Sequence, residues 1–330
     1  MNLNNIDFFK CVFEDPGTVP GTFNNDFFKE RSYLGGWTVS TRHPYNGLKR
    51  FPFTNYIHSN TVEDVSIDDL RQTLESTVKN YATDKNVIFL SGGKDSTALA
   101  HVFKKLEIPF TAVSLFSTVS NTTEKHIVKT IEQELDIDVK YFRLDTIPQK
   151  DFFYWVENPY TAKVIALTEL GLTNHRIFTG EIGTGEMQVN QALQYTAMKG
   201  YNPRALARWH VNVCGSYRKV NSVLDLHEDG IYKECVAHFE ERFNQWQEHP
   251  DVLNRVMFAR LQDEGSYRLF NYGLDDFEWV HPFAEDSFIY KCVNMPSHYK
   301  GKKNLYKLMY NDLTNIPWRY PKSGLGITTM

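Results

Sequence analysis

One stretch of the chain, NVIFLSGGKDSTALAH at residues 86–101, limits the possible folds more than any other. A short apolar run stops at Ser91-Gly92-Gly93, and a helical pattern begins directly after it. Two glycines allow the backbone to approach a ligand closely, and the N–H groups of a helix start attract anions. The sequence therefore predicts a strand, a tight turn and a helix N-terminus that together bind a phosphate group.

The polar residues of this turn extend the prediction to a metal ion. Ser91 and Ser96 add hydroxyl groups, whereas Asp95 places a carboxylate where a bound phosphate would repel it. A divalent cation between the two anions would remove that repulsion. The turn matches neither GxxxxGK followed by Ser or Thr nor GxGxxG, the patterns of two other nucleotide-binding turns.

The turn resembles instead the SGGxDS PP-loop of the ATP pyrophosphatase group, whose members split ATP between its α- and β-phosphates. In that group the turn holds the departing pyrophosphate. The resemblance implies ATP and Mg²⁺ as ligands and a fold similar to that of the adenine nucleotide alpha hydrolases. The residues that it assigns to the nucleotide and its metal are Ser91, Gly92, Gly93, Lys94, Asp95 and Ser96.

From residue 86 onward, apolar β-branched runs alternate with helical patterns, as in a parallel α/β sheet with flanking helices. Ligands of such sheets bind beyond the carboxyl ends of the strands. Three strand ends are therefore expected to meet at one crevice: the Ser91 turn, Leu115 with the two residues after it, and Thr179-Gly180-Glu181. The expected strands are residues 87–90, 110–116, 139–144 and 176–179, and the expected helices are 96–106, 123–135 and part of 152–170.

A chain of 330 residues can form one large domain or two, and we expect a division at about residue 80. Residues 1–80 are rich in Asn, Gly, Pro and aromatic residues, which predicts a small β-rich cap that ends in a helix from Ser66 or Asp68 to Lys79. Residues 81–330 are the expected main domain, with its α/β part in residues 81–190. Residues 191–330 are helical, aromatic and charged, and we expect them to form a helical layer over the crevice.

Two later segments resemble asparagine synthetases. Residues 178–186, FTGEIGTGE, are similar to their SGEGADE turn, and the segment from HPFAEDSF to YPKSGLGI is similar to their PFLD-to-GFG tail. Order and spacing match over residues 86–327, and the β-lactam synthetases are related. The resemblance implies that Thr179 and Gly180 lie against the α-phosphate and that Glu181 accepts a proton from the incoming ammonia.

The same resemblance assigns three more charged residues. Glu285 takes the place of the PFLD aspartate, and Lys322 matches the lysine that stabilises charge during adenylation and acyl transfer. The magnesium-binding aspartate of GADE has no counterpart here. Glu186 is the expected substitute, as a second metal ligand beside Asp95.

These groups suit a carboxylate substrate, which is a poor electrophile for an amine until it is adenylated. A metal ion and a lysine stabilise the charge that develops, and a carboxylate base removes the proton from nitrogen. We therefore expect an ATP-dependent ligase that forms an amide and releases AMP and pyrophosphate. Asn2 stands where a glutaminase carries its nucleophilic cysteine, so the expected nitrogen source is ammonia or an amine, supplied free or by a separate partner.

Two other functions stay open. Lysine at position 94 is common in PP-loop enzymes that modify nucleotides, tRNA or DNA, and the missing GADE aspartate is compatible with a degenerate ATP-binding regulatory protein. The net charge of -4 gives no general attraction to nucleic acid. Residues 204–219 are basic and aromatic, but we expect them to form an amphipathic packing helix rather than a nucleic-acid interface.

The remaining features concern metals and the compartment. Four cysteines are scattered without a spacing typical of zinc, iron–sulfur or disulfide sites. The sequence contains no signal-peptide pattern and no apolar run of membrane-spanning length. We expect a cytoplasmic protein without a membrane partner.

Overall fold

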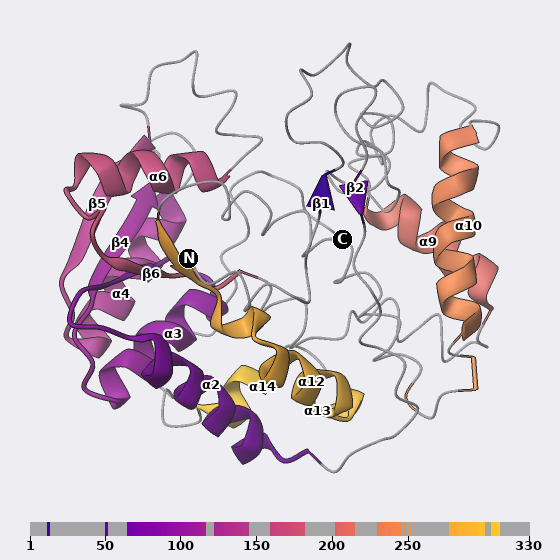
Figure 1. The fold of residues 1–330 in the computed structure, drawn as a ribbon, viewed down its shortest axis with the longest axis horizontal. Coiled ribbons are helices and arrows are strands. Elements are labelled where there is room, and N and C mark those ends of the chain that lie inside the picture. The colour runs from indigo at the N-terminus through magenta and orange to yellow at the C-terminus, as the bar shows by residue number, and fades with distance from the viewer. Residues whose placement is uncertain are drawn as a thin grey trace.

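In the computed structural model of the protein, the described residues are 12–13, 50–51, 65–116, 122–144, 159–181, 202–214, 230–245, 247–248, 251, 277–300 and 305–310. They form a β-sheet, the helices that flank it, and a second group of helices on the far side of the molecule (Figure 1).

A five-stranded sheet with the order β5-β4-β3-β6-β7 lies at the centre of the nucleotide-binding part predicted from the sequence. All four neighbouring pairs are parallel, which confirms the predicted α/β fold. The strands are β3 Asn86–Phe89, β4 Thr111–Phe116, β5 Val139–Arg143, β6 Arg176–Phe178 and β7 Glu278–Val280.

The strand order contains one topological switch. From β3 the chain steps outward to β4 and then β5, and it returns to the opposite side of β3 with β6. In open parallel sheets, the strands diverge at such a point and leave a crevice outside their carboxyl ends, where ligands bind. The turn that follows β3 therefore lies at the position that the topology favours for a ligand.

Three helices follow β3, β4 and β5 in the chain, with nearly the bounds expected from the sequence. They are α3 Lys94–Lys105, α4 Thr122–Leu135 and α6 Pro159–Glu169. In α3, Leu99, Val102 and Phe103 recur at helical spacing and are completely buried. This apolar face holds α3 on the sheet and fixes the position of its first turn.

Helix α2, Ile67–Tyr81, precedes the sheet and begins with a capping box. The Ser66 hydroxyl accepts from the Asp69 N–H at 3.0 Å, and the Asp69 carboxylate accepts from the Ser66 N–H at 3.1 Å. The apolar face of α2 is completely buried, and the helix packs against α12 and α14. The residues of this face are Leu70, Leu74 and Val78.

The C-terminal part that reaches the sheet region consists of short elements. A 3₁₀ turn at Pro282–Ala284 follows β7 and leads to α12, and both contact α2. The helices are α12 Asp286–Asn294, α13 Ser297–Lys300 and α14 Leu305–Met309. Helices α12 and α14, which are distant from α2 in the sequence, thus lie beside it, and α2 also contacts α3 (Figure 1).

Helices α9, Pro203–Cys214, and α10, Gly230–Gln245, pack against each other and lie away from the sheet (Figure 1). In α9 the arginines Arg204 and Arg208 are exposed while Leu206 and Val211 are buried. This confirms the predicted amphipathic packing helix for its described residues.

Within the described chain, no helix is both long enough and apolar enough to span a membrane.

Strand β7 corrects the expectation that residues 191–330 are helical. It contributes only three residues to the sheet, two of them apolar and buried, and this is too short a run to produce a period-two pattern. Its pairing with β6 defines it as a strand.

In residues 1–80, β1 Val12–Phe13 and β2 Arg50–Phe51 form an antiparallel pair. The division of the chain into two domains stays a prediction.

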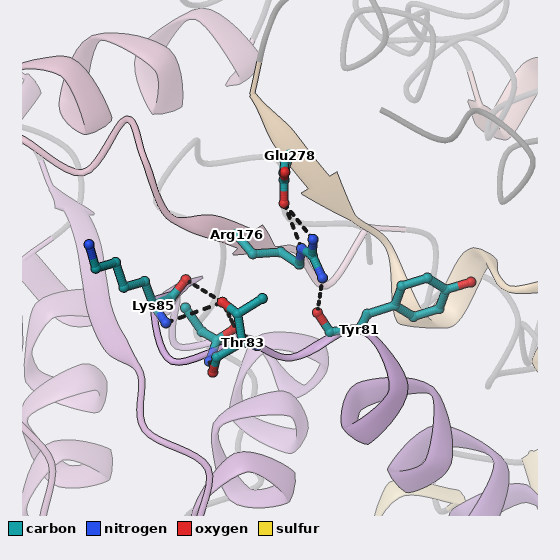
Figure 2. Close-up of polar contacts among 6 residues, drawn as sticks. Tyr81, Thr83, Lys85, Arg176 and Glu278 are labelled. Atoms are coloured by element: carbon teal, nitrogen blue, oxygen red, sulfur yellow. Dashed lines mark hydrogen bonds and ion pairs between the residues drawn. The ribbon is translucent and has the colours of Figure 1, made fainter.

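A polar cluster joins the N-terminal ends of β6 and β7 to the turn before β3 (Figure 2). These strand ends lie opposite the predicted crevice. Arg176 begins β6, and its guanidinium contacts the carboxylate of Glu278, which begins β7, at 2.6 and 2.7 Å. The same guanidinium donates to the Tyr81 carbonyl at 2.7 Å, while the Thr83 hydroxyl donates to the Lys85 carbonyl at 3.0 Å. These contacts hold the two strands and the turn before β3 in register.

Candidate functional site

The turn after β3 is held in shape by its own hydroxyl groups. The Ser91 N–H donates to Ser96 Oγ at 3.0 Å, and Ser96 Oγ donates to the Ser91 carbonyl at 3.1 Å. The Thr97 hydroxyl donates to the Gly93 carbonyl at 2.7 Å. These hydrogen bonds within the chain hold residues 91–97 in one shape, so little conformational entropy has to be lost when a ligand binds.

The N-cap of α3 is Gly93, which has no side chain with which to cap the first turn. This distinguishes α3 from α2, where the Ser66 hydroxyl accepts from the Asp69 N–H in the first turn. The dipole of this 12-residue helix favours an anion at its N-terminal end. The geometry of residues 91–96 suits a phosphate group.

Gly180, just beyond β6, is packed directly against the first turn of α3. A Cβ atom on Gly180 would lie 2.7 Å from Asp95 Cβ and 2.9 Å from the Ser96 backbone nitrogen. Only glycine permits this approach. This contact joins the end of β6 to the 91–96 loop that follows β3. The prediction that the ends of β3 and β6 meet is therefore confirmed.

The third predicted strand end also lies at this edge. Phe89 pairs with Val113, and the Leu90 N–H donates to the Val113 carbonyl at 2.8 Å. Leu115 follows two residues later on β4, half-buried and level with the start of the loop. The carboxyl ends of β3, β4 and β6 therefore meet, whereas the binding of a nucleotide by them stays a prediction.

Asp95 is held by a contact that the sequence did not indicate. The hydroxyl of Tyr306 in α14 donates to Asp95 Oδ1. Tyr306 is completely buried, and its ring packs edge-on against Phe283 with centroids 6.4 Å apart. A tyrosine within an apolar helix indicates only a core position, so no signal near residue 306 reveals this role.

A second contact that the sequence missed joins Lys163 to Glu181. Lys163 of α6 places its Nζ 2.7 Å from Glu181 Oε1, and the two side chains are only 12% and 18% exposed. The Lys163 ammonium group also lies 5.9 Å from the centre of the Phe89 ring, within the range of a cation–π contact. The acid that resembles a catalytic base is thus paired with a lysine at the end of β6.

Strand β7 adds a buried histidine behind Thr179. The Thr179 hydroxyl lies 2.6 Å from His281 Nδ1, and the Thr179 N–H donates to the Val280 carbonyl at 3.0 Å. Burial is the main reason that the pKa of His281 is lowered to about 3; nearby Glu181 acts to raise this pKa, and Lys163 acts to lower it. His281 is therefore neutral at physiological pH and acts on Thr179 as a hydrogen-bond partner, not as a charge.

Glu285 forms a hydrogen bond with helix α2. Its Oε1 accepts from the Tyr81 hydroxyl at 3.1 Å, and burial raises the pKa of its carboxyl group, against the lowering effect of the Tyr81 bond. Tyr81 is the last residue of α2, so this hydrogen bond joins Glu285 to the C-terminal end of that helix. Its catalytic role stays a prediction from resemblance.

The remaining predicted site residues differ in how the structure describes them. Lys94 is buried in the first turn of α3. Glu186 and Lys322 lie outside the described residues. Of the two predicted metal ligands, only Asp95 therefore lies in the part of the chain that the structure describes. Within that part, no group of three or more His, Cys, Asp or Glu side chains could hold a metal ion.

No protein-family model and no curated protein matches the sequence. Solved structures with some similarity include an NMN synthetase from Francisella tularensis, with 16% identity and a TM-score of 0.32 over 62% of this chain and 97% of that one. Another is a U34-tRNA thiolase from Methanococcus maripaludis with its 4Fe-4S cluster, with 15% identity and a TM-score of 0.31 over 62% of this chain and 80% of that one. Similarities of this size do not establish a common fold or function.

Proposed function

We propose that the crevice between β3 and β6 binds ATP and that the protein is a PP-loop ATP pyrophosphatase that activates its substrate by adenylation. The observation that carries the proposal is the loop of residues 91–96, which is held by its own hydrogen bonds and packed against Gly180 at the topological switch of the sheet. A bound anion suits this position electrostatically, because N–H groups and a helix dipole converge there.

Different residues of the chain would bind different parts of ATP. The loop and the first turn of α3 would hold the pyrophosphate portion, and Thr179 with Gly180 would lie against the α-phosphate. His281 fixes the Thr179 hydroxyl from behind at 2.6 Å. ATP itself supplies the phosphoanhydride bond whose cleavage drives activation.

Mg²⁺ fits the same site because the available metal ligand there is a carboxylate oxygen. Asp95 lies in the first turn of α3, directly beside the proposed phosphate position, and hard cations prefer carboxylate oxygens. Tyr306 orients this carboxylate from α14. Glu186 is the second proposed ligand, on the basis of the resemblance to the GADE turn.

The finer proposal is an amide-forming reaction. The substrate would be a carboxylic acid that is adenylated, and the acyl group would pass to ammonia or an amine with release of AMP. Glu181 lies at the end of β6 beside Thr179 and Gly180, where a base for the attacking nitrogen is required. Lys322 would stabilise the charge of both steps, and Glu285 is the proposed counterpart of the PFLD aspartate.

Pyrophosphate exchange into ATP tests the proposal directly. Purified protein is incubated with ATP, Mg²⁺, labelled pyrophosphate and a panel of carboxylic acids, and the nucleotide products are identified. Acid-dependent exchange with AMP as the product supports the proposal, whereas ADP and phosphate would contradict it. AMP formed only when tRNA or DNA is added would replace the amide reaction with nucleic-acid modification, and retained ATP without turnover would indicate a regulatory protein.

A further inference from the structure

We propose that Lys163 is the positioning residue for Glu181, so that the two side chains act as one unit in the nitrogen-transfer half of the reaction. This inference rests on the proposed function, and it adds to it a residue outside every motif of the sequence. The geometry points to Lys163 because its Nζ lies 2.7 Å from Glu181 Oε1 and both side chains are largely buried.

Glu181 is fixed from its backbone outward. Gly180 cannot move away from α3 without opening its close contact with Asp95, and the Glu181 N–H donates to Thr179 Oγ1 at 3.4 Å. The backbone thus places the side chain, and Lys163 places the carboxylate. Lys163 in turn is held over the ring of Phe89, the last residue of β3.

The charge of the pair matters as much as its position. A carboxylate near the phosphates of ATP and near an acidic substrate would repel both of them, and these anions would favour its protonation. The ammonium group of Lys163 offsets both effects. A base must enter the reaction unprotonated, so Lys163 keeps Glu181 able to accept a proton when the crevice is filled with anions.

The step that depends on this pair is balanced as follows. The lone pair of the attacking nitrogen forms a C–N bond to the acyl carbon, and the bond from that carbon to the AMP oxygen breaks with its electrons on AMP. The proton leaves the nitrogen for the Glu181 carboxylate. Adenylation itself transfers no proton to Glu181, so Lys163 should matter much less in the first half of the reaction.

A double-mutant cycle separates an action through Glu181 from other roles of Lys163. Pyrophosphate exchange reports the first half-reaction, and amide formation from ammonium chloride, with an acid active in exchange, reports the second. Lys163→Met should lower amide formation by ~10²-fold, as expected for loss of a general base, and exchange much less. Added to Glu181→Gln, it should cost little more, because the two residues share one function.

Two further variants complete the design. Lys163→Arg retains the charge and should recover part of the amide formation that Lys163→Met loses. Lys105→Met is the control. Lys105 is the last residue of α3, at the end of the helix away from the 91–96 loop, and it forms an ion pair of similar length, 2.8 Å, with Glu75 of α2. Equal losses in both half-reactions, additive losses in the cycle, or the same losses in the control would overturn the proposal.

A measurement without turnover distinguishes failure of this inference from failure of the proposed function. In the described part of the chain, the charged and titratable groups near Glu181 include Lys163 of α6, His281 after β7 and, across Gly180, Asp95 of α3. Carbon-13 NMR of labelled glutamate carboxyl groups, assigned with Glu181→Gln, follows the Glu181 titration. The midpoint of this titration should move to higher pH in Lys163→Met. An unchanged midpoint would overturn the pairing of Lys163 with Glu181, even if the protein catalyses pyrophosphate exchange. Absence of pyrophosphate exchange would instead reject the proposed function, and with it the role of the pair in nitrogen transfer.

Discussion

Gly180 and Asp95 are packed so closely that the space between β6 and α3 admits no side chain at position 180. A Cβ atom there would lie 2.7 Å from Asp95 Cβ and 3.1 Å from the Asp95 carbonyl carbon. Most of the opposing atoms are backbone, which cannot rotate away as a side chain can. This contact couples the end of β6 to the start of α3, two segments that are far apart in the sequence.

Gly180→Ala should therefore damage both stability and nucleotide binding. Overpacking of this kind costs about 1–3 kcal/mol of unfolding free energy, and the forced shift would displace the 91–96 loop. Urea unfolding and calorimetric titration with Mg-ATP measure the two effects. Gly230→Ala is the matched control, since a Cβ at Gly230 meets nothing within 4 Å; equal effects of the two substitutions would contradict the argument.

Asp95→Asn should weaken ATP binding only when the metal is present. The amide retains the size of the side chain, and its oxygen can still accept from Tyr306, but it loses the charge that attracts a divalent cation. Without the metal, removal of a carboxylate beside the phosphates should leave ATP affinity equal or higher. Titrations in Mg²⁺ and in EDTA make the comparison, with the exposed Asp136→Asn as control. A loss of the same size in both buffers would mean that Asp95 holds the loop rather than a metal.

The sheet and the loop were predictable because their signals are local. Glycines in the turn, β-branched residues in β3 and helical spacing in α3 lie within 20 residues of each other, and the parallel arrangement then requires the strand ends to meet. The position of the candidate site follows from these rules together with the strand order.

The residues that complete the site could not be predicted in this way. Tyr306 contacts Asp95 across 211 positions, and His281 contacts Thr179 across 102. Such pairs depend on how α14 and β7 pack against the sheet, and neither a buried tyrosine nor a three-residue strand differs locally from ordinary core. The predicted roles of Glu186 and Lys322 depend on resemblance alone, because both lie outside the described residues.

Lys322→Ala tests the resemblance of the C-terminal tail. If Lys322 stabilises charge that develops only in the transition state, the substitution should lower turnover by ~10²–10³ and affect ATP binding much less. Steady-state kinetics with an active acid and equilibrium binding of ATP give the two values. Lys79→Ala, an exposed lysine in the last turn of α2, serves as control. Equal losses of binding and turnover would assign Lys322 to nucleotide binding or to the fold.

His281 should make the stability of the protein depend on pH in acid. Burial lowers the pKa of His281 from 6.5 to about 3 in the folded state. Above about pH 6.5 the histidine is neutral in both states and contributes no slope. Between those values the unfolded chain binds a proton that the folded chain does not, so the unfolding free energy should fall by up to about 1.4 kcal/mol for each unit that the pH decreases.

His281→Gln isolates this contribution from that of the carboxylates, which titrate in the same range. Glutamine can still form a hydrogen bond with Thr179 but binds no proton, so the variant should be less stable than the wild type at pH 8 and lose stability more gradually toward pH 4.5. Urea unfolding at a series of pH values gives both curves. The exposed His126→Gln on α4 should leave the slope of the wild type intact. If His281→Gln also retained that slope, His281 would have to be protonated in the folded protein, and its role as a neutral partner of Thr179 would have to be abandoned.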